Sequence, residues 1–296
     1  MLSTPHCDVM QDTNGQGHGG GDLAIGAMNV KEQVGATVQP NRTKALLAAG
    51  QAAIGPTIME SWSVAVVRIM AAAGFDYLFL DTEHTSIGSE SLYTLIQMSL
   101  ACDITPLVRV VDLSYPLVSR ALDMGAQGII IPRVETQEQA EAAVSYVKYP
   151  PLGRRGAGGD ARYGYERRPM QQAISEANAE TMVVVMVESV LGLENLDEIA
   201  SVPGLDVIHI GPQDLSISLG IPWQMDHPRL QEAIAHVVDT CQRHAITAGQ
   251  NDRDAANFRQ WYEMGFRFLC SNNDLNMLTA AAQRDARVLR EIMAVG

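Results

Sequence analysis

From residue 41 onward, short apolar runs typical of buried β-strands alternate with longer segments that carry apolar residues at helical spacing. The strand-like runs cover residues 53–59, 77–81, 105–109, 128–131, 181–187, 207–210, 246–250 and 268–271. The helix-like segments cover residues 41–47, 62–73, 92–102, 116–124, 136–147, 171–178, 193–200, 230–244, 255–264 and 275–290, with a turn at 215–219. Strands that alternate with helices form parallel sheets, and eight such units predict an α/β fold, the (β/α)8 TIM barrel.

Residues 1–40 differ from the rest of the chain, because residues 14–21 are too rich in glycine to hold regular structure. We expect residues 1–40 to form a flexible arm that orders only against a neighbouring subunit, if at all. Residues 41–296 are expected to form a single catalytic barrel domain. His6, Cys7 and His18 could bind a metal in principle, but the composition favours a polar tail.

The charge of the chain excludes several classes of partner. A net charge of −13 argues against nucleic acid and against an anionic membrane surface. The N-terminus lacks a secretory signal, and no apolar run is long enough to cross a bilayer. The four cysteines form no CxxC pair, so we expect a reducing, cytoplasmic location. The low charged fraction of 19% is a weak hint that other subunits cover part of the surface.

Ionisable residues stand where several predicted strands end. Asp81, Glu83 and His84 follow the second strand, and Arg109 ends the third. The carboxyl ends of barrel strands form the rim on which active sites are built. A surface loop of mixed charges is the alternative for the first three residues, and a salt bridge to a neighbouring carboxylate is the alternative for Arg109.

Two further carboxylates suggest a metal site at the same rim. Glu188 follows an apolar strand, where a charge is out of place unless it is paired or bound to metal. Asp214 follows the next strand, although it could also cap the turn at 215–219. Oxygen ligands without nearby cysteines suit Mg²⁺ or Mn²⁺, with Co²⁺ or Zn²⁺ as further candidates. His209 lies within a strand and is expected to be a core histidine.

Seven short motifs occur together in the order and spacing of one known family, and the chain resembles that family, the HpcH/HpaI class II aldolases. The matching stretches are residues 80–84, 106–109, 122–128, 132–136, 149–156, 186–188 and 210–216. The relatives act on 2-keto-3-deoxy sugar acids and 4-hydroxy-2-oxo acids. The resemblance implies a divalent-metal-dependent aldolase that reversibly cleaves a 4-hydroxy-2-oxo acid to pyruvate and an aldehyde through a metal-stabilised enolate.

The resemblance also implies roles for individual residues. Glu188 and Asp214 match the metal ligands, and Arg109 matches the arginine that contacts the pyruvate carbonyl oxygen. His84 matches the histidine of the acid/base dyad and Asp123 its carboxylate partner. Asp81 and Glu83 match acidic positions near metal-bound water. The stretch that matches the cradle for the pyruvate carboxylate consists of Gly211, Pro212, Gln213 and Asp214.

One departure from the family pattern and several rival functions remain. Met186 stands where several members have glutamine, which removes a polar contact near pyruvate. No lysine is placed for a Schiff base: Lys148 precedes a proline-rich loop, and Lys31 and Lys44 precede the barrel. Citrate-lyase-like, citrate-synthase-like or decarboxylase chemistry on oxaloacetate is the main alternative. A non-catalytic metal-binding scaffold and a nucleotide binder that uses the glycines near Gly156 are weaker ones. The family resemblance suggests a homo-hexamer.

Overall fold

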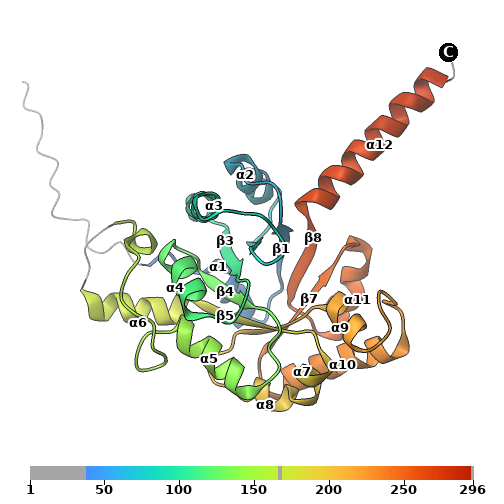
Figure 1. Cartoon of the computed structure of the whole chain (residues 1–296). Helices are drawn as coiled ribbons and strands as arrows, with labels where there is room; N and C mark the ends of the chain where they lie inside the picture. Colours follow the sequence, from blue (N-terminus) through green and yellow to red (C-terminus); the bar gives the residue numbers. More distant parts are fainter. Residues whose placement is uncertain (1–37, 166–168, 295–296) are drawn as a thin grey trace, which may run out of the picture. The chain divides into compact units, whose positions relative to one another are not determined.

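The computed structural model describes residues 38–165 and 169–294, and in it eight parallel strands close into a barrel in chain order. Figure 1 shows the strands at the centre, with helices around them. The strands are β1 (Ala53–Ile58), β2 (Tyr77–Asp81), β3 (Thr105–Arg109), β4 (Gly128–Ile131), β5 (Met182–Val187), β6 (Val207–Ile210), β7 (Thr247–Asp252) and β8 (Phe268–Asn273). The predicted α/β barrel is confirmed. Residues 1–37 of the predicted arm lie outside the described residues.

Most helices match the predicted segments with small shifts at their ends. The segment predicted at 193–200 is instead two short helices that meet at Asn195, and a helix begins at Pro212 where a turn was predicted at 215–219. The helices are α1 (Arg42–Ala48), α2 (Val64–Ala72), α3 (Ser89–Ala101), α4 (Tyr115–Asp123), α5 (Gln137–Val147), α6 (Met170–Glu180), α7 (Val190–Glu194), α8 (Leu196–Ala200), α9 (Pro212–Ser218), α10 (Pro228–Arg243), α11 (Phe258–Met264) and α12 (Asp274–Ala294). There are also two short 3₁₀ helices, η2 (Asp160–Tyr163) and η3 (Ala255–Asn257).

Capping residues explain where three of the helices begin. Asn41 caps α1, as predicted, by accepting from the amide of Lys44 at 2.9 Å. The second helix begins at Val64 rather than at residue 62, because the Ser63 side chain caps it. Asp214 lies in the first turn of α9 and does not cap it, since the N-cap position is Gly211.

Side chains that alternate along each strand build two apolar layers. In β5, Val183, Val185 and Val187 pack in the cluster between the barrel and the helices. Met182, Val184 and Met186 belong to the cluster inside the barrel. Inside the barrel, the rings of Tyr77 and Phe268 stack at 4.3 Å. A strand that is buried on both faces reads as a continuous apolar run, which is why β5 could be predicted so clearly.

The strand register determines which polar residues meet at the rim. Asp81 pairs with Arg109 across β2 and β3, and Val187 pairs with Ile210 across β5 and β6. The residues that follow this second pair, Glu188 and Gly211, are therefore neighbours. Because all strands are parallel, these two pairs lie at the same end of the barrel.

The first and last strands of the chain, β1 and β8, pair with each other, and the carboxylate of Asp274 adds further hydrogen bonds between their ends. Gly55 of β1 pairs with Cys270 of β8. Asp274, the first residue of α12, accepts from the amides of Met59, Glu60 and Ser61 at 2.6–3.1 Å. Asp274 is also the buried residue of α12, whose later apolar side chains are exposed. In the part of the chain that the structure describes, no helix is both long and apolar enough to span a membrane.

Candidate active site

A cavity of about 270 Å³ lies at the carboxyl ends of the strands. Most of the predicted site residues line it, and they come from four strand ends: Asp81, His84, Arg109, Glu188, Gly211, Gln213 and Asp214. Glu83 lies directly beside it through its contact with Arg109, and Pro212 follows Gly211 in α9. The rim of the barrel thus brings together residues that are more than a hundred positions apart in the sequence.

The ends of β2 and β3 carry a closed ion-pair network, which we call the paired arc (Asp81, Glu83 and Arg109). The guanidinium of Arg109 donates to both carboxylate oxygens of Asp81, at 2.9 and 2.6 Å. Its Nη1 lies 3.1 Å from Oε2 of Glu83. Burial alone would lower the pKa of Arg109, but the hydrogen bonds and charge of Asp81 outweigh it and raise that pKa. Arg109 is therefore a fixed cation whose position is determined by two acids.

The salt-bridge alternative for Arg109 is thus present, yet it does not use the whole side chain. A guanidinium carries five N–H donors, and three are directed at Asp81 and Glu83. The side chain is 11% exposed and lines the cavity. Arg109 can therefore be held by the acids and still donate to a ligand in the cavity.

Glu83 links the paired arc to two further side chains. Its carboxylate is paired with the exposed Arg133 as well as with Arg109. Nε2 of His84 lies 3.7 Å from Oε2 of Glu83, and the imidazole is 58% exposed. His84 therefore faces the cavity from its mouth, next to an acid that can orient it.

Glu188 is buried and only half satisfied. Its Oε1 accepts from the backbone amide of Arg133 at 2.8 Å, whereas the buried Oε2 has no hydrogen-bond partner among the described residues. Burial raises the pKa of Glu188 to about 7, and the nearby charge of Asp214 adds to the rise against the opposing effects of the Arg133 amide and the Arg109 charge. A buried acceptor without a partner is unusual in a folded protein and indicates a ligand.

Gly211 is required by this arrangement. A Cβ atom at position 211 would lie 2.2 Å from Oε2 of Glu188, so any side chain would displace the carboxylate. Asp214, in the first turn of α9, is exposed and lines the same cavity. We call Glu188 and Asp214 the open arc, because neither carboxylate has a cationic partner recorded in the described structure.

The open arc has the donor chemistry of a site for a hard divalent cation. An orphaned carboxylate oxygen, a second carboxylate and a glycine that keeps space between them fit such an ion. Within residues 38–165 and 169–294, no three His, Cys, Asp or Glu side chains group into a metal site. The protein would therefore supply two carboxylates and leave other positions to a ligand or water.

Asp123 lies apart from His84 in this chain. It ends α4, accepts from Arg155 at 2.9 Å, and lines a different cavity together with Tyr93 and Arg120. Gly159 packs against it so closely that a Cβ there would lie 2.5 Å from its Cα. The glycines near Gly156 thus allow close packing beside a carboxylate, which disfavours phosphate. The pairing of Asp123 with His84 stays a prediction.

Met186, His209 and Lys148 can be placed relative to the candidate site, whereas Lys31 lies outside the described residues. Met186 is 4% exposed and lines the cavity, so a thioether stands at its floor. His209 is the buried partner of Met186 across β5 and β6, and burial lowers the pKa of His209 to about 3, so it is a neutral core residue. Lys148 donates to the carbonyls of Asn178 and Thr181, the latter just before β5, at the opposite end of the barrel from the rim. No described lysine lines the candidate site.

Several residues that line the cavity or contact its lining were not predicted from the sequence. Arg133 follows β4, and its role depends on a backbone amide and a positive φ of 52°, which its side-chain type does not reveal. Asn251 and Asp252 end β7 and Arg253 follows it, so all three stand at a strand end like the residues that were predicted. The predicted strand ended at residue 250, so these three residues were placed in a loop.

Comparison with known proteins gives a family match over most of the chain. A profile of the family described as HpcH/HpaI aldolase/citrate lyase matches residues 59–269. That range runs from the end of β1 to β8 and includes every residue of the paired and open arcs.

Individual relatives cover a similar range. The chain is 32% identical over 86% of its length to 2-keto-3-deoxy-L-rhamnonate aldolase of Salmonella gallinarum (strain 287/91 / NCTC 13346), 95% of which is covered. It is 33% identical over 85% of its length to hydroxypyruvate/pyruvate aldolase of Cupriavidus necator, with 93% of that protein covered. The crystal structure of the citrate synthase SbnG superposes with a TM-score of 0.78 at 30% identity, covering 85% of this chain and 98% of the other.

Proposed function

The chain belongs to the HpcH/HpaI aldolase/citrate lyase family and is an aldolase, and we propose that it reversibly cleaves a 4-hydroxy-2-oxo acid to pyruvate and an aldehyde with the help of a divalent metal ion. The observation that carries this proposal is the buried, half-satisfied Glu188 beside Asp214. A carboxylate in this state needs a cation, and the fixed cation of the site, Arg109, is already engaged by two acids.

Glu188 and Asp214 would hold the ion, for which Mg²⁺ and Mn²⁺ are the first candidates. When bound, such an ion supplies Lewis-acid stabilisation of negative charge on the keto oxygen of a 2-oxo acid. The relatives named above support this substrate class, because one of them is a pyruvate aldolase and the other an aldolase of a 2-keto-3-deoxy acid.

Arg109 supports the same charge from the other side of the cavity. Its two uncommitted N–H groups can donate to the oxygen on which negative charge develops when the carbon–carbon bond breaks. Because Asp81 and Glu83 hold the guanidinium in place before substrate arrives, little reorganisation accompanies the reaction.

The first turn of α9 is suited to bind the substrate carboxylate. The Gly211 amide already donates to Val187 at 3.4 Å, and Pro212 has no amide hydrogen. Gln213 and Asp214 therefore supply the amides of the cradle, since first-turn amides have no acceptor within their own helix. Within the stretch 211–214, we therefore propose these two residues as the amide donors to the substrate carboxylate.

His84 is the residue that we propose moves protons. It lines the cavity, is open to solvent and lies beside Glu83. Removing the proton of the 4-hydroxyl group starts cleavage, and returning a proton to the methylene carbon completes pyruvate. Asp123, which the family resemblance implies as the carboxylate partner of His84, lines a different cavity in this chain, and its pairing with His84 stays a prediction.

The test is the exchange of the methyl protons of pyruvate for deuterium, followed by NMR. Exchange should occur with Mn²⁺ or Mg²⁺, stop with a chelator and return when metal is restored. Glu188→Ala and Asp214→Ala should abolish it, whereas Glu141→Ala, on an exposed face of α5, should not. Metal-independent exchange, or wild-type exchange in either site variant, would contradict the proposal.

Oxaloacetate chemistry is the second candidate, because a citrate synthase shares the fold at 30% identity. Such an enzyme would also stabilise an enolate, so the cavity alone does not separate the two reactions. The same NMR measurement does: rapid exchange of oxaloacetate with no exchange of pyruvate would favour the second candidate.

A further inference from the structure

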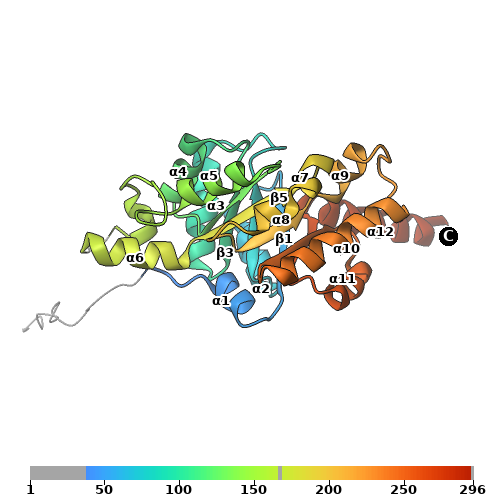
Figure 2. The same cartoon turned by 90° about the horizontal axis from the view of Figure 1, so that it is seen from below.

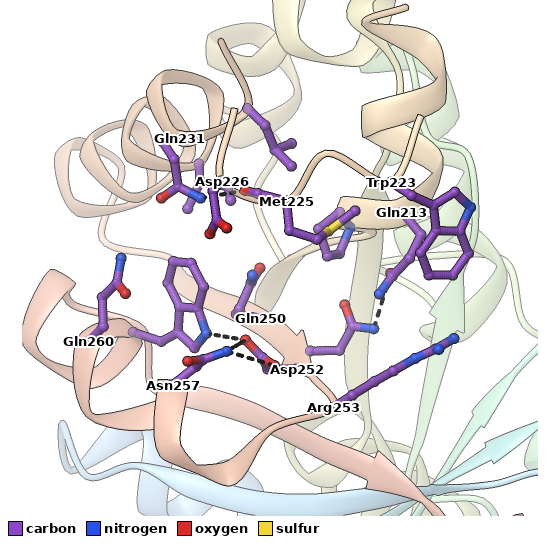
Figure 3. Close-up of a pocket in the computed structure, with 15 residues that line it drawn as sticks. Gln213, Trp223, Met225, Asp226, Gln231, Gln250, Asp252, Arg253, Asn257 and Gln260 are labelled. Carbon is purple, nitrogen blue, oxygen red and sulfur yellow. Dashed lines mark hydrogen bonds between the residues drawn. The ribbon is translucent and has the colours of Figure 1, made fainter. Parts of the chain in front are cut away.

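A second cavity of about 270 Å³ lies outside the barrel, between α10 and the η3–α11 segment. Figure 2 shows α10 and α11 side by side along one flank of the barrel. Figure 3 shows the lining of this cavity, which is rich in carboxamide side chains and contains two tryptophans. Its volume suits a small molecule or the end of one rather than a large ligand.

The second cavity adjoins the candidate active site. Five residues line both: Gln213, Trp223, Asn251, Asp252 and Arg253. The boundary between the cavities is held by weak contacts, a hydrogen bond of 3.5 Å from Asn251 to Gln213 and the stacking of Arg253 on Trp223 at 5.1 Å (Figure 3). A ligand in the active site can therefore extend into the second cavity by displacing one long hydrogen bond and one exposed cation–π contact.

Two buried acceptors in this region lack partners. Gln250 is 1% exposed and lines the second cavity, and its Oε1 has no hydrogen-bond partner among the described residues. Oδ1 of Asn251, on the shared boundary, is in the same state. Buried acceptors of this kind are normally satisfied, so both oxygens indicate a donor that comes from a bound molecule.

The remaining lining defines the chemistry of that molecule. Trp261 and Leu230 offer apolar surface to carbon atoms. Asp226 and Asp252 outnumber the single cation Arg253, so a second carboxylate on the ligand would be repelled. Asp252 is already committed to Trp261 and Asn257. The site is therefore suited to a short, uncharged carbon chain with hydroxyl donors.

We propose that this cavity receives the distal, hydroxylated end of the aldehyde portion of the substrate, and that Gln250 and Asn251 determine specificity for uncharged over carboxylate-terminated aldehydes. The inference rests on the proposed aldolase function and adds a subsite to it. Oε1 of Gln250 accepts a hydrogen bond from a ligand hydroxyl and takes no part in bond cleavage.

The first test compares two four-carbon aldehydes, D-erythrose and succinic semialdehyde, in the aldol addition to pyruvate. The wild-type protein should give a higher kcat/KM with erythrose. Gln250→Met keeps the volume of the side chain and should lower the ratio of the two kcat/KM values about 2- to 10-fold, the effect of one hydrogen bond. The control is Gln242→Met, which makes the same chemical change on the exposed face of α10, a helix that borders the cavity. It should leave the ratio unchanged.

Because Gln250 is buried, a second measurement uses the wild-type protein alone. Saturation-transfer NMR with erythritol, an unreactive four-carbon polyol, should show contact with the protein in the presence of chelator and of excess pyruvate, which fills the carboxylate cradle, whereas succinate under the same conditions should show none. Equal signals from both compounds, or no erythritol signal, would overturn the subsite and indicate a water-filled cavity.

The pyruvate exchange experiment separates the two levels of the argument. Exchange in the wild-type protein together with an aldehyde ratio that Gln250→Met does not change overturns the subsite alone. Absence of exchange overturns the proposed function and the subsite with it.

Discussion

The paired arc and the open arc lie on the same rim and treat their carboxylates in opposite ways. Asp81 and Glu83 are fully engaged by arginines. Glu188 keeps one buried oxygen without a partner, and burial raises its pKa to about 7. The difference shows that carboxylates at one barrel rim can have different roles. Carboxylates that are paired with arginines hold side chains in place, whereas a carboxylate oxygen without a partner is available to a ligand.

The largest effect should come from breaking the paired arc. Arg109→Met keeps the side-chain stem but leaves the buried Asp81 without its cation, which should lower the free energy of unfolding by about 3–5 kcal/mol. The turnover rate should also fall, by on the order of 3 kcal/mol in activation free energy. Urea unfolding and steady-state kinetics measure the two losses. A stable Arg109→Met variant would show that the pairing is not structural.

Neutralising the open arc should have a different outcome. Glu188→Gln keeps the shape of the side chain but removes a metal-binding charge, so the affinity for Mn²⁺ should fall by more than about 100-fold. The metal-free variant should be at least as stable as the wild type, because a buried, unpaired charge is lost. Titration calorimetry and urea unfolding with chelator test both statements.

Glu83→Gln is the matched control, since it makes the same chemical change in the paired arc. It should destabilise the protein, because two arginines lose a charged partner. If both variants changed stability in the same direction, the distinction between the arcs would be incorrect.

The open arc should also give the metal-free protein a distinctive pH dependence. The pKa of Glu188 is raised from 4.5 to about 7, so the folded state holds this proton more tightly than the unfolded state does. The free energy of unfolding should therefore fall as the pH rises from about 4.5 to about 7, by no more than about 1.4 kcal/mol per pH unit, and level off above.

Metal affinity should rise over the same pH interval, because the proton and the metal compete for the carboxylate. Unfolding of the wild type and of Glu188→Gln with chelator, at pH 5, 6, 7 and 8, isolates the contribution of this residue. Identical slopes in the two proteins would assign the titration to another group.

The smallest effect is expected at the exposed edge of the paired arc. Arg133→Ala removes a side chain that is 56% exposed and paired with Glu83, and it keeps the backbone amide that holds Glu188. The loss of stability should stay below about 1 kcal/mol, because exposed ion pairs contribute little. Urea unfolding checks the magnitude, and a loss as large as that of Arg109→Met would mean that exposure does not separate the two arginines.

The fold could be predicted because apolar runs alternate with segments of helical spacing, and β2, β4, β5 and β6 are buried along their whole length. The rim positions of Asp81, Arg109, Glu188 and Asp214 followed from the strand ends alone. Their pairing did not, because it depends on a register in which Asp81 lies opposite Arg109. Side-chain type also could not predict Arg133, which acts on Glu188 through its backbone.

The packing of the helices against the barrel could not be predicted from the sequence either. The cavity at Gln250 depends on how α10 and α11 lie against β7, and helix spacing predicts the helices without their separation. The separate locations of Asp123 and His84 depend in the same way on where α4 ends relative to β2. Local sequence patterns predict each helix and strand. They do not predict the distances between elements, which determine this cavity and the positions of Asp123 and His84.

The contact of Asp274 with the loop after β1 has a consequence for how the protein is made. Its partner Met59 lies 215 positions earlier in the chain, and β1 and β8 are equally far apart in sequence. On the ribosome, β1 therefore emerges long before the strand that covers its open edge. Until β8 is synthesised, the nascent chain is an incomplete sheet with an unpaired strand edge, which is the state most exposed to misassociation. The closing contacts of the barrel are among the last that translation can supply.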